Sequence, residues 1–131
     1  MNLKSLRIIT GDIKRLVPFY ESVTGLAAQW FTEDFAELAT GTATLAIGNT
    51  RTLSLFGEGV AEPASNKSVI IEFLVDNVDE VYERVKALVP VIVQHPTTMP
   101  WGNRSLLFRD PDGNLINFFT PVTPEAIQKF S

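Results

Sequence analysis

The single histidine, His95, and the absence of cysteine restrict the chemistry that this chain can perform. Without cysteine there is no thiolate nucleophile, no thiolate metal ligand and no disulfide. One histidine cannot supply several imidazole ligands to a metal from a single chain. His95 directly precedes Pro96 and lies far in the sequence from any second base or nucleophile. We therefore interpret it as a surface or loop residue and predict no Ser-His-Asp site.

The carboxylates give no better evidence for catalysis. Asp110 and Asp112 belong to the segment DPDGN at residues 110–114. Pro111 presets one turn dihedral and Gly113 accepts a positive φ, so this segment predicts a hairpin turn rather than an acid catalyst. Other acids, at 79, 80 and 83, are typical of the solvated face of a helix. We assign no catalytic residue.

Composition excludes further classes of function. The 131 residues are 45% hydrophobic and 20% charged, which is typical of one globular domain. The net charge is −4 and the basic residues form no cluster, so we expect no nucleic-acid partner. No apolar run approaches the roughly 20 residues that cross a bilayer, and the first residues lack the pattern of a signal peptide. We expect a cytoplasmic protein without a membrane partner.

The first half of the chain predicts a strand, a helix and three short strands. The strand covers residues 3–10, and Asp12 is a suitable N-cap for the helix that follows. Gly25 ends that helix, and Pro18 either kinks it or separates its first turn. Residues 51–56 are either a further strand or a helical turn. The three strands cover residues 27–31, 35–39 and 42–47.

The second half repeats this order. A strand at 69–75 precedes Asn77, which has capping-box spacing to Glu80, and an apolar stripe then predicts a helix through Leu88. Three further strands are predicted at 91–95, 104–109 and 115–120, before a short helical tail.

The chain is therefore an internal βαβββ repeat, in which Asp12 corresponds to Asn77, 65 residues further on. We predict a single α+β domain with a concave mixed β-sheet cleft, because one helix can cover only one face of a four-stranded sheet. Its parts are module one (1–57), a linker (58–66), module two (67–121) and a C-terminal tail (122–131).

Arg7 and Glu72 are the most informative charges, because they occupy equivalent positions in the two modules. Alternation directs the flanking apolar residues toward the helices, so Arg7 and Glu72 face the cleft. Three roles remain open for them: an ion pair between the modules, direct contact with a ligand, or simple exposure to solvent. Burial offsets most of the attraction in an ion pair, which leaves room for a functional role.

Several motifs resemble the vicinal oxygen chelate superfamily, which includes glyoxalases, extradiol dioxygenases and bleomycin-resistance proteins. The resemblance spans nearly all of residues 3–120. The first half carries it at Asp12-Ile13, Phe19-Tyr20 and Gly25-Leu26. The second half carries it at residues 73–79, at Pro100-Trp101-Gly102 and at 108–116, FRDPDGNLI, which is the most specific element.

Metal-dependent members of that superfamily place His, Gln or Glu early in the first strand of each module and Glu in the last strand. By resemblance, these positions fall on Ser5, Ile70, Asn117 and Leu45 or a neighbour of Leu45. None of these side chains is a good ligand for zinc or non-haem iron. We therefore predict no metal and no other cofactor.

Without metal ligands, the sequence most resembles the bleomycin-resistance proteins of the superfamily, which bind a small molecule in the concave sheet. The last strand, residues 115–119, is apolar on both faces, and one of those faces would line the cavity. Trp101 would border the cavity mouth and stack on a planar ligand, although core or dimer packing explains Trp30 and Trp101 as well. The predicted ligand-binding residues are Arg7, Trp30, Glu72, Trp101, Asn117 and Phe119.

We therefore predict a homodimer that binds or sequesters a small hydrophobic or aromatic compound. The alternative is an enzyme of the same superfamily, of the lyase or isomerase type, with an atypical metal-independent site that uses Arg7 or Glu72. A third reading is an accessory subunit with a vestigial cavity.

Overall fold

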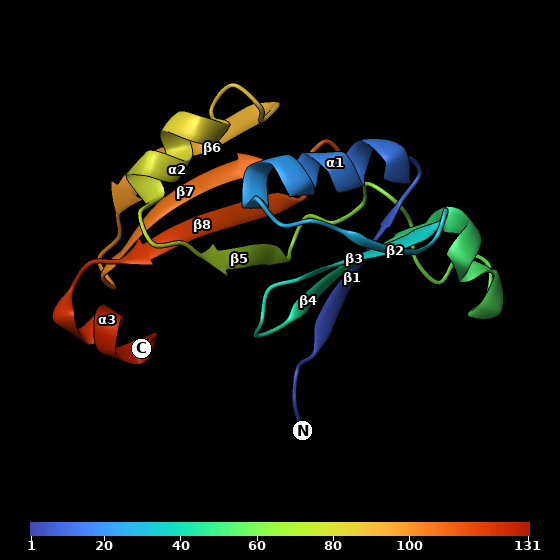
Figure 1. Ribbon diagram of the computed structural model, residues 1–131, viewed down its shortest axis with the longest axis horizontal. Coiled ribbons are helices and arrows are strands. Elements are labelled where there is room, and N and C mark those ends of the chain that lie inside the picture. The colour runs from blue at the N-terminus through green and yellow to red at the C-terminus, as the bar shows by residue number, and fades with distance from the viewer. The chain divides into compact units, whose positions relative to one another are not determined.

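A computed structural model describes all residues from Met1 to Ser131, and the chain divides into two compact units at residues 1–66 and 67–131 (Figure 1). Each unit holds one four-stranded mixed sheet with a helix packed against it. No helix is both long and apolar enough to cross a membrane.

The first unit has the predicted βαβββ order. Its sheet has the order β1-β4-β3-β2, in which β1 runs parallel to β4 and the other pairs are antiparallel. A six-residue 3₁₀ segment, η1, follows the last strand, so residues 51–56 are helical and do not form a strand. The elements are β1 (Ser5–Thr10), α1 (Ile13–Thr24), β2 (Gln29–Thr32), β3 (Phe35–Ala39), β4 (Thr44–Asn49) and η1 (Thr50–Leu55).

The second unit repeats this topology with the order β5-β8-β7-β6, and β5 runs parallel to β8. Together the two units confirm the predicted α+β fold of two βαβββ modules. The elements are β5 (Ile70–Leu74), α2 (Val78–Val85), β6 (Val91–Thr98), β7 (Asn103–Arg109), β8 (Leu115–Pro121) and α3 (Pro124–Lys129).

The two helices begin differently, although their sequences predict similar caps. The Asn77 side chain accepts hydrogen bonds from the backbone N–H groups of Asp79 and Glu80, as predicted. Asp12 makes no such bond, so its predicted role as a side-chain cap is wrong. Its own N–H instead donates to the Thr10 hydroxyl over 3.1 Å. Pro18 lies inside a continuous α1.

Each unit has its own apolar core between one helix and one sheet face. In the first unit, α1 packs on β3 and β4, and the buried residues include Leu16, Tyr20 and Ile47. In the second, the ring of Phe118 meets the rings of Phe73 and Phe108 edge-on, with centroids 5.5 and 5.0 Å apart. Each helix covers only one face of its sheet, as the repeat predicts.

The strand β6 is longer than predicted. It continues through Pro96 to Thr98, whereas the sequence places its end at His95. β6 lies at the edge of its sheet and has register shifts between Ile92 and Thr97, so a proline without an N–H donor is tolerated there. The predicted end of α2 is also wrong, because the helix stops at Val85 and not at Leu88.

Candidate functional site

The open face of the second sheet, meaning the face opposite to α2, brings together three predicted site residues. The register pairs Glu72 with Asn117 and places Phe119 two residues further along β8, on the same face. The neighbouring strand adds Leu107 opposite Asn117. The other members of this face are the apolar residues Ile70, Leu74 and Leu115 and the polar residues Gln94, Ser105 and Arg109.

Glu72 and Asn117 form the polar centre of this face. The Asn117 amide Nδ2 donates to the Glu72 carboxylate over 2.7 Å. Asn117 is only 7% exposed, and its Oδ1 is buried without a hydrogen-bond partner. A buried acceptor that lacks a donor costs about 1–3 kcal/mol.

Phe119 lies on the predicted face, but the C-terminal segment packs against it. The ring of Phe130, just after α3, lies 5.0 Å from the Phe119 ring, and Phe119 is only 6% exposed. Because Phe119 points away from the core residue Phe118, this contact places Phe130 on the open face. The sequence gives no sign of the contact.

Trp101 lies in the tight turn between β6 and β7. The Gly102 N–H donates to the Met99 carbonyl, and the Met99 N–H donates to the Asn103 carbonyl. The same glycine accepts from the N–H of Thr123 at the start of α3. Trp101 is 68% exposed. This turn and Phe119 therefore lie at the same end of the second sheet, with the indole open to solvent.

In the first unit the register separates two residues that were predicted to share a ligand. Arg7 aligns with Ala46, and Ala46 aligns with Glu37, so these three residues share the face opposite to α1. Trp30 aligns with Ala36, which belongs to the buried side that α1 covers. Arg7 and Trp30 therefore lie on opposite faces of their sheet.

Arg7 contacts two aromatic rings of its own unit. Its guanidinium carbon lies 5.0 Å from the ring centre of Phe35 and 5.6 Å from that of Phe56. These distances are typical of cation–π interactions. The ion pair of Arg7 with Glu72 stays a prediction.

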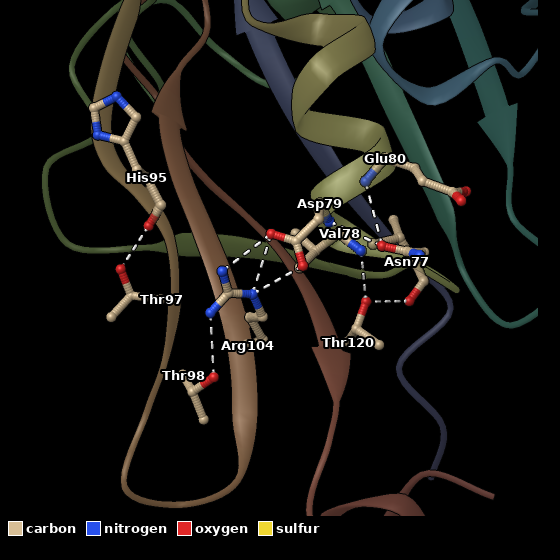
Figure 2. Close-up of polar contacts among 10 residues, drawn as sticks. Asn77, Val78, Asp79, Glu80, His95, Thr97, Thr98, Arg104 and Thr120 are labelled. Carbon is tan, nitrogen blue, oxygen red and sulfur yellow. Dashed lines mark hydrogen bonds and ion pairs between the residues drawn. The ribbon is translucent and has the colours of Figure 1, made fainter.

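His95 belongs to a different part of the second unit, on the edge strand β6 (Figure 2). It is exposed, and its ring meets the Tyr82 ring of α2 with centroids 5.6 Å apart. Nearby, Arg104 on β7 donates to both carboxylate oxygens of Asp79, and these hydrogen bonds raise the pKa of Arg104. The Thr120 hydroxyl accepts from the Val78 N–H. These contacts hold α2 against its sheet. None of them pairs a nucleophilic side chain with a general base.

By resemblance, the metal-ligand positions of metal-dependent superfamily members fall on four residues of this chain, and their side chains do not suit a divalent metal. Ser5 and Ile70 begin equivalent strands, and Asn117 lies in the middle of β8. Leu45 aligns with Leu38 in the core, so its neighbour Ala46 is the residue on the Arg7 face. Neither unit contains a group of three or more His, Cys, Asp or Glu residues that could hold a metal.

We expect no stoichiometric transition metal in the purified protein, because these positions offer one hydroxyl and one amide beside aliphatic side chains. Elemental analysis after purification in buffer supplemented with zinc, nickel and iron measures this. A content near one metal per chain would contradict the assignment of the ligand positions.

Comparisons with known proteins agree with this architecture. Protein YraH of Bacillus subtilis is 26% identical over 125 residues, which are 91% of this chain and 98% of YraH. A family enzyme from Burkholderia phytofirmans, a glyoxalase/bleomycin resistance protein/dioxygenase, superposes with a TM-score of 0.81 at 19% identity, over 93% of this chain and 100% of the other. A protein from the mobile metagenome of V. Pseudocholerae is 30% identical with a TM-score of 0.71, over 92% of this chain and 94% of the other.

The family model for these proteins matches residues 2–118, which is most of the chain. This confirms the family that the motifs of both modules indicate. The chain belongs to the Glyoxalase/Bleomycin resistance protein/Dioxygenase superfamily.

Proposed function

We propose that this protein binds a small hydrophobic or aromatic compound on the open faces of its sheets, without a metal ion. The observation that carries the proposal is the Glu72–Asn117 pair, which joins two side chains on a face where Ile70, Leu74, Leu107 and Leu115 are apolar. Ligand sites are typically apolar surfaces with a few polar groups that fix orientation. Ile70 and Asn117 stand at positions where metal-dependent relatives carry ligands, which favours binding without metal.

The polar pair gives this face a preference among apolar compounds. The Glu72 carboxylate and the Asn117 Oδ1 are both acceptors, and one of the two N–H groups of the Asn117 amide already donates to Glu72. A compound with an N–H or O–H group on an aromatic ring donates to the exposed Glu72 carboxylate and packs its ring against Leu74 and Leu107. Trp30 has no part in this proposal, because it lies on the side of its sheet that α1 covers.

A thermal-shift screen against aromatic natural products and small electrophiles tests the proposal. Compounds that raise the melting temperature are then titrated against the fluorescence of the two tryptophans. Saturable quenching with the compound recovered unchanged supports binding. If no compound in such a library binds, the proposal fails.

An enzyme of the same superfamily is the second candidate, and the exposed Glu72 carboxylate favours it. A carboxylate held by one amide hydrogen bond on an apolar face could take a proton from a bound compound. Time-dependent consumption of the compound supports this candidate. Glu72→Gln should then abolish consumption and retain binding, whereas a pure binder shows no consumption with either protein.

We also propose a homodimer, because each sheet leaves one face without a helix and pairing of chains would cover apolar residues such as Leu74, which is 48% exposed. Light scattering at micromolar concentrations should give twice the chain mass of 14.5 kDa. A constant mass of one chain over that range would rule out the dimer.

A further inference from the structure

Arg7 differs from Arg51 and Arg104 in the partners of its guanidinium group. Arg51 and Arg104 each direct a guanidinium fork at one aspartate, Asp34 and Asp79. Arg7 has no carboxylate partner within its unit, and its contacts there are with the two rings, Phe35 and Phe56. An aromatic ring engages the flat face of a guanidinium, whereas the five N–H donors lie in the plane of the group. The Arg7 donors are therefore available.

Three separate elements hold this arrangement, which we call the Arg7 clamp (Arg7, Phe35 and Phe56). Arg7 lies in the middle of β1 and Phe35 begins β3. Phe56 directly follows η1, and its N–H donates to the Leu53 carbonyl over 2.9 Å. Two strands on either side of β4 and the end of a helical turn therefore position the three side chains.

A polar link at Asp34 connects η1 to the rest of the unit. Asp34, in the turn before β3, accepts from Arg51 and from the Asn49 amide, and these hydrogen bonds lower the pKa of Asp34. At Gly48, a side chain would meet the Thr52 hydroxyl of η1 at 2.9 Å, so η1 lies close against β4. Phe56, which is 65% exposed, therefore presents an apolar surface beside the guanidinium from a fixed turn.

The surroundings of the Arg7 clamp favour one orientation of a ligand. Across the sheet from Arg7 stand the small residue Ala46 and then Glu37, two strands away. Strands lie about 4.8 Å apart, so the backbones at Arg7 and Glu37 are separated by about 10 Å. The Glu37 charge repels an anion from the β3 side. An acidic group is thereby directed to Arg7, with any attached ring beside Phe56.

We infer that the Arg7 clamp recognises an aromatic anion, in which the acidic group accepts two in-plane N–H bonds and the ring packs on Phe35 and Phe56. A planar guanidinium matches a carboxylate or sulfonate in this two-point manner. This inference rests on the proposed function, since it specifies which apolar compounds the protein selects. Acidic aromatic compounds bind, and their neutral counterparts bind more weakly.

Two fluorescent probes that differ by one acidic group test the inference. Anilinonaphthalenesulfonate and phenylnaphthylamine share their rings, and only the first carries a sulfonate. The wild-type protein should bind the sulfonate more tightly. Arg7→Met should weaken the sulfonate about tenfold or more and leave phenylnaphthylamine within about twofold, as expected for the loss of a charge-assisted hydrogen bond.

Matched variants separate the local effect from net charge and from unfolding. Lys14→Met removes the same charge from α1, on the other side of the first sheet, and should change neither affinity. Arg7→Lys retains the charge without the planar fork, so its sulfonate affinity should fall between wild type and Arg7→Met. A circular dichroism spectrum and a melting temperature close to those of the wild-type protein show that each variant is folded.

The possible failures are distinguishable. If phenylnaphthylamine binds but Arg7→Met leaves the affinity for the sulfonate unchanged, the inference is wrong and the proposed function stands. If Lys14→Met lowers the affinity for the sulfonate as much as Arg7→Met does, general charge attraction explains the binding and the inference is wrong. If neither probe binds the wild-type protein, the proposed function fails and the inference fails with it.

Discussion

Replacement of Gly102 by alanine is expected to lower the free energy of unfolding by about 2–5 kcal/mol, the sum of left-handed strain and overpacking. Gly102 has a φ of +97°, and an added Cβ would lie 2.1 Å from the Thr123 hydroxyl oxygen and 3.0 Å from Ala126 Cβ. Thr123 cannot move freely, because its hydroxyl accepts from the Ala126 N–H and caps α3. Chemical denaturation followed by circular dichroism measures the loss.

Gly113→Ala is the matched control for this substitution. Gly113 also has a positive φ, +86°, but an added Cβ there meets nothing within 4 Å. It should therefore cost only the conformational strain, about 1–2 kcal/mol. An equal loss of unfolding free energy for the two variants would mean that the contact between the Trp101 turn and α3 does not contribute to stability.

The second large effect concerns binding. Trp101→Ala should weaken a planar ligand roughly tenfold or more, because stacking contributes about 0.5–1.5 kcal/mol beyond buried area and each 1.4 kcal/mol is one decade of affinity. The indole is 68% exposed at the end of the second sheet where Phe119 lies, so it is accessible in the absence of ligand. Titration with a compound from the thermal-shift screen measures the change.

Two substitutions in the same unit serve as controls for Trp101. His95 lies against Tyr82 of α2, and Asp112 lies in the turn at the opposite end of β7. His95→Ala and Asp112→Asn should each leave affinity within about twofold. Normal binding by Trp101→Ala together with weak binding by His95→Ala would refute the assignment of the site to the open face.

The repeat and the faces of the β1, β5 and β8 residues were predictable, because both follow from alternation within one module. Arg7 and Glu72 face away from the helices, and Asn117 shares the Glu72 face, as alternation requires. The DPDGN turn was predictable as well, since Asp110 accepts from the N–H groups of Asp112 and Asn114 there.

The remaining features depend on contacts that no local pattern encodes. Trp30 lies on the α1 side because the pairing of β2 with β3 sets its register, including a shift between Trp30 and Thr32. Phe130 reaches Phe119 only because the Gly102 turn anchors α3. The Arg7 clamp needs Phe56, which lies 49 positions away in sequence and beyond three strands.

The central claim is that this family member binds an apolar compound without metal and leaves it unaltered. The most direct test is a titration of the chelator-treated protein with a compound from the screen, followed by mass spectrometry of that compound. We predict saturable binding with the same affinity whether or not zinc, nickel or iron is added back, and recovery of the compound at its original mass. Binding that requires the added metal, or conversion of the compound, would contradict the claim.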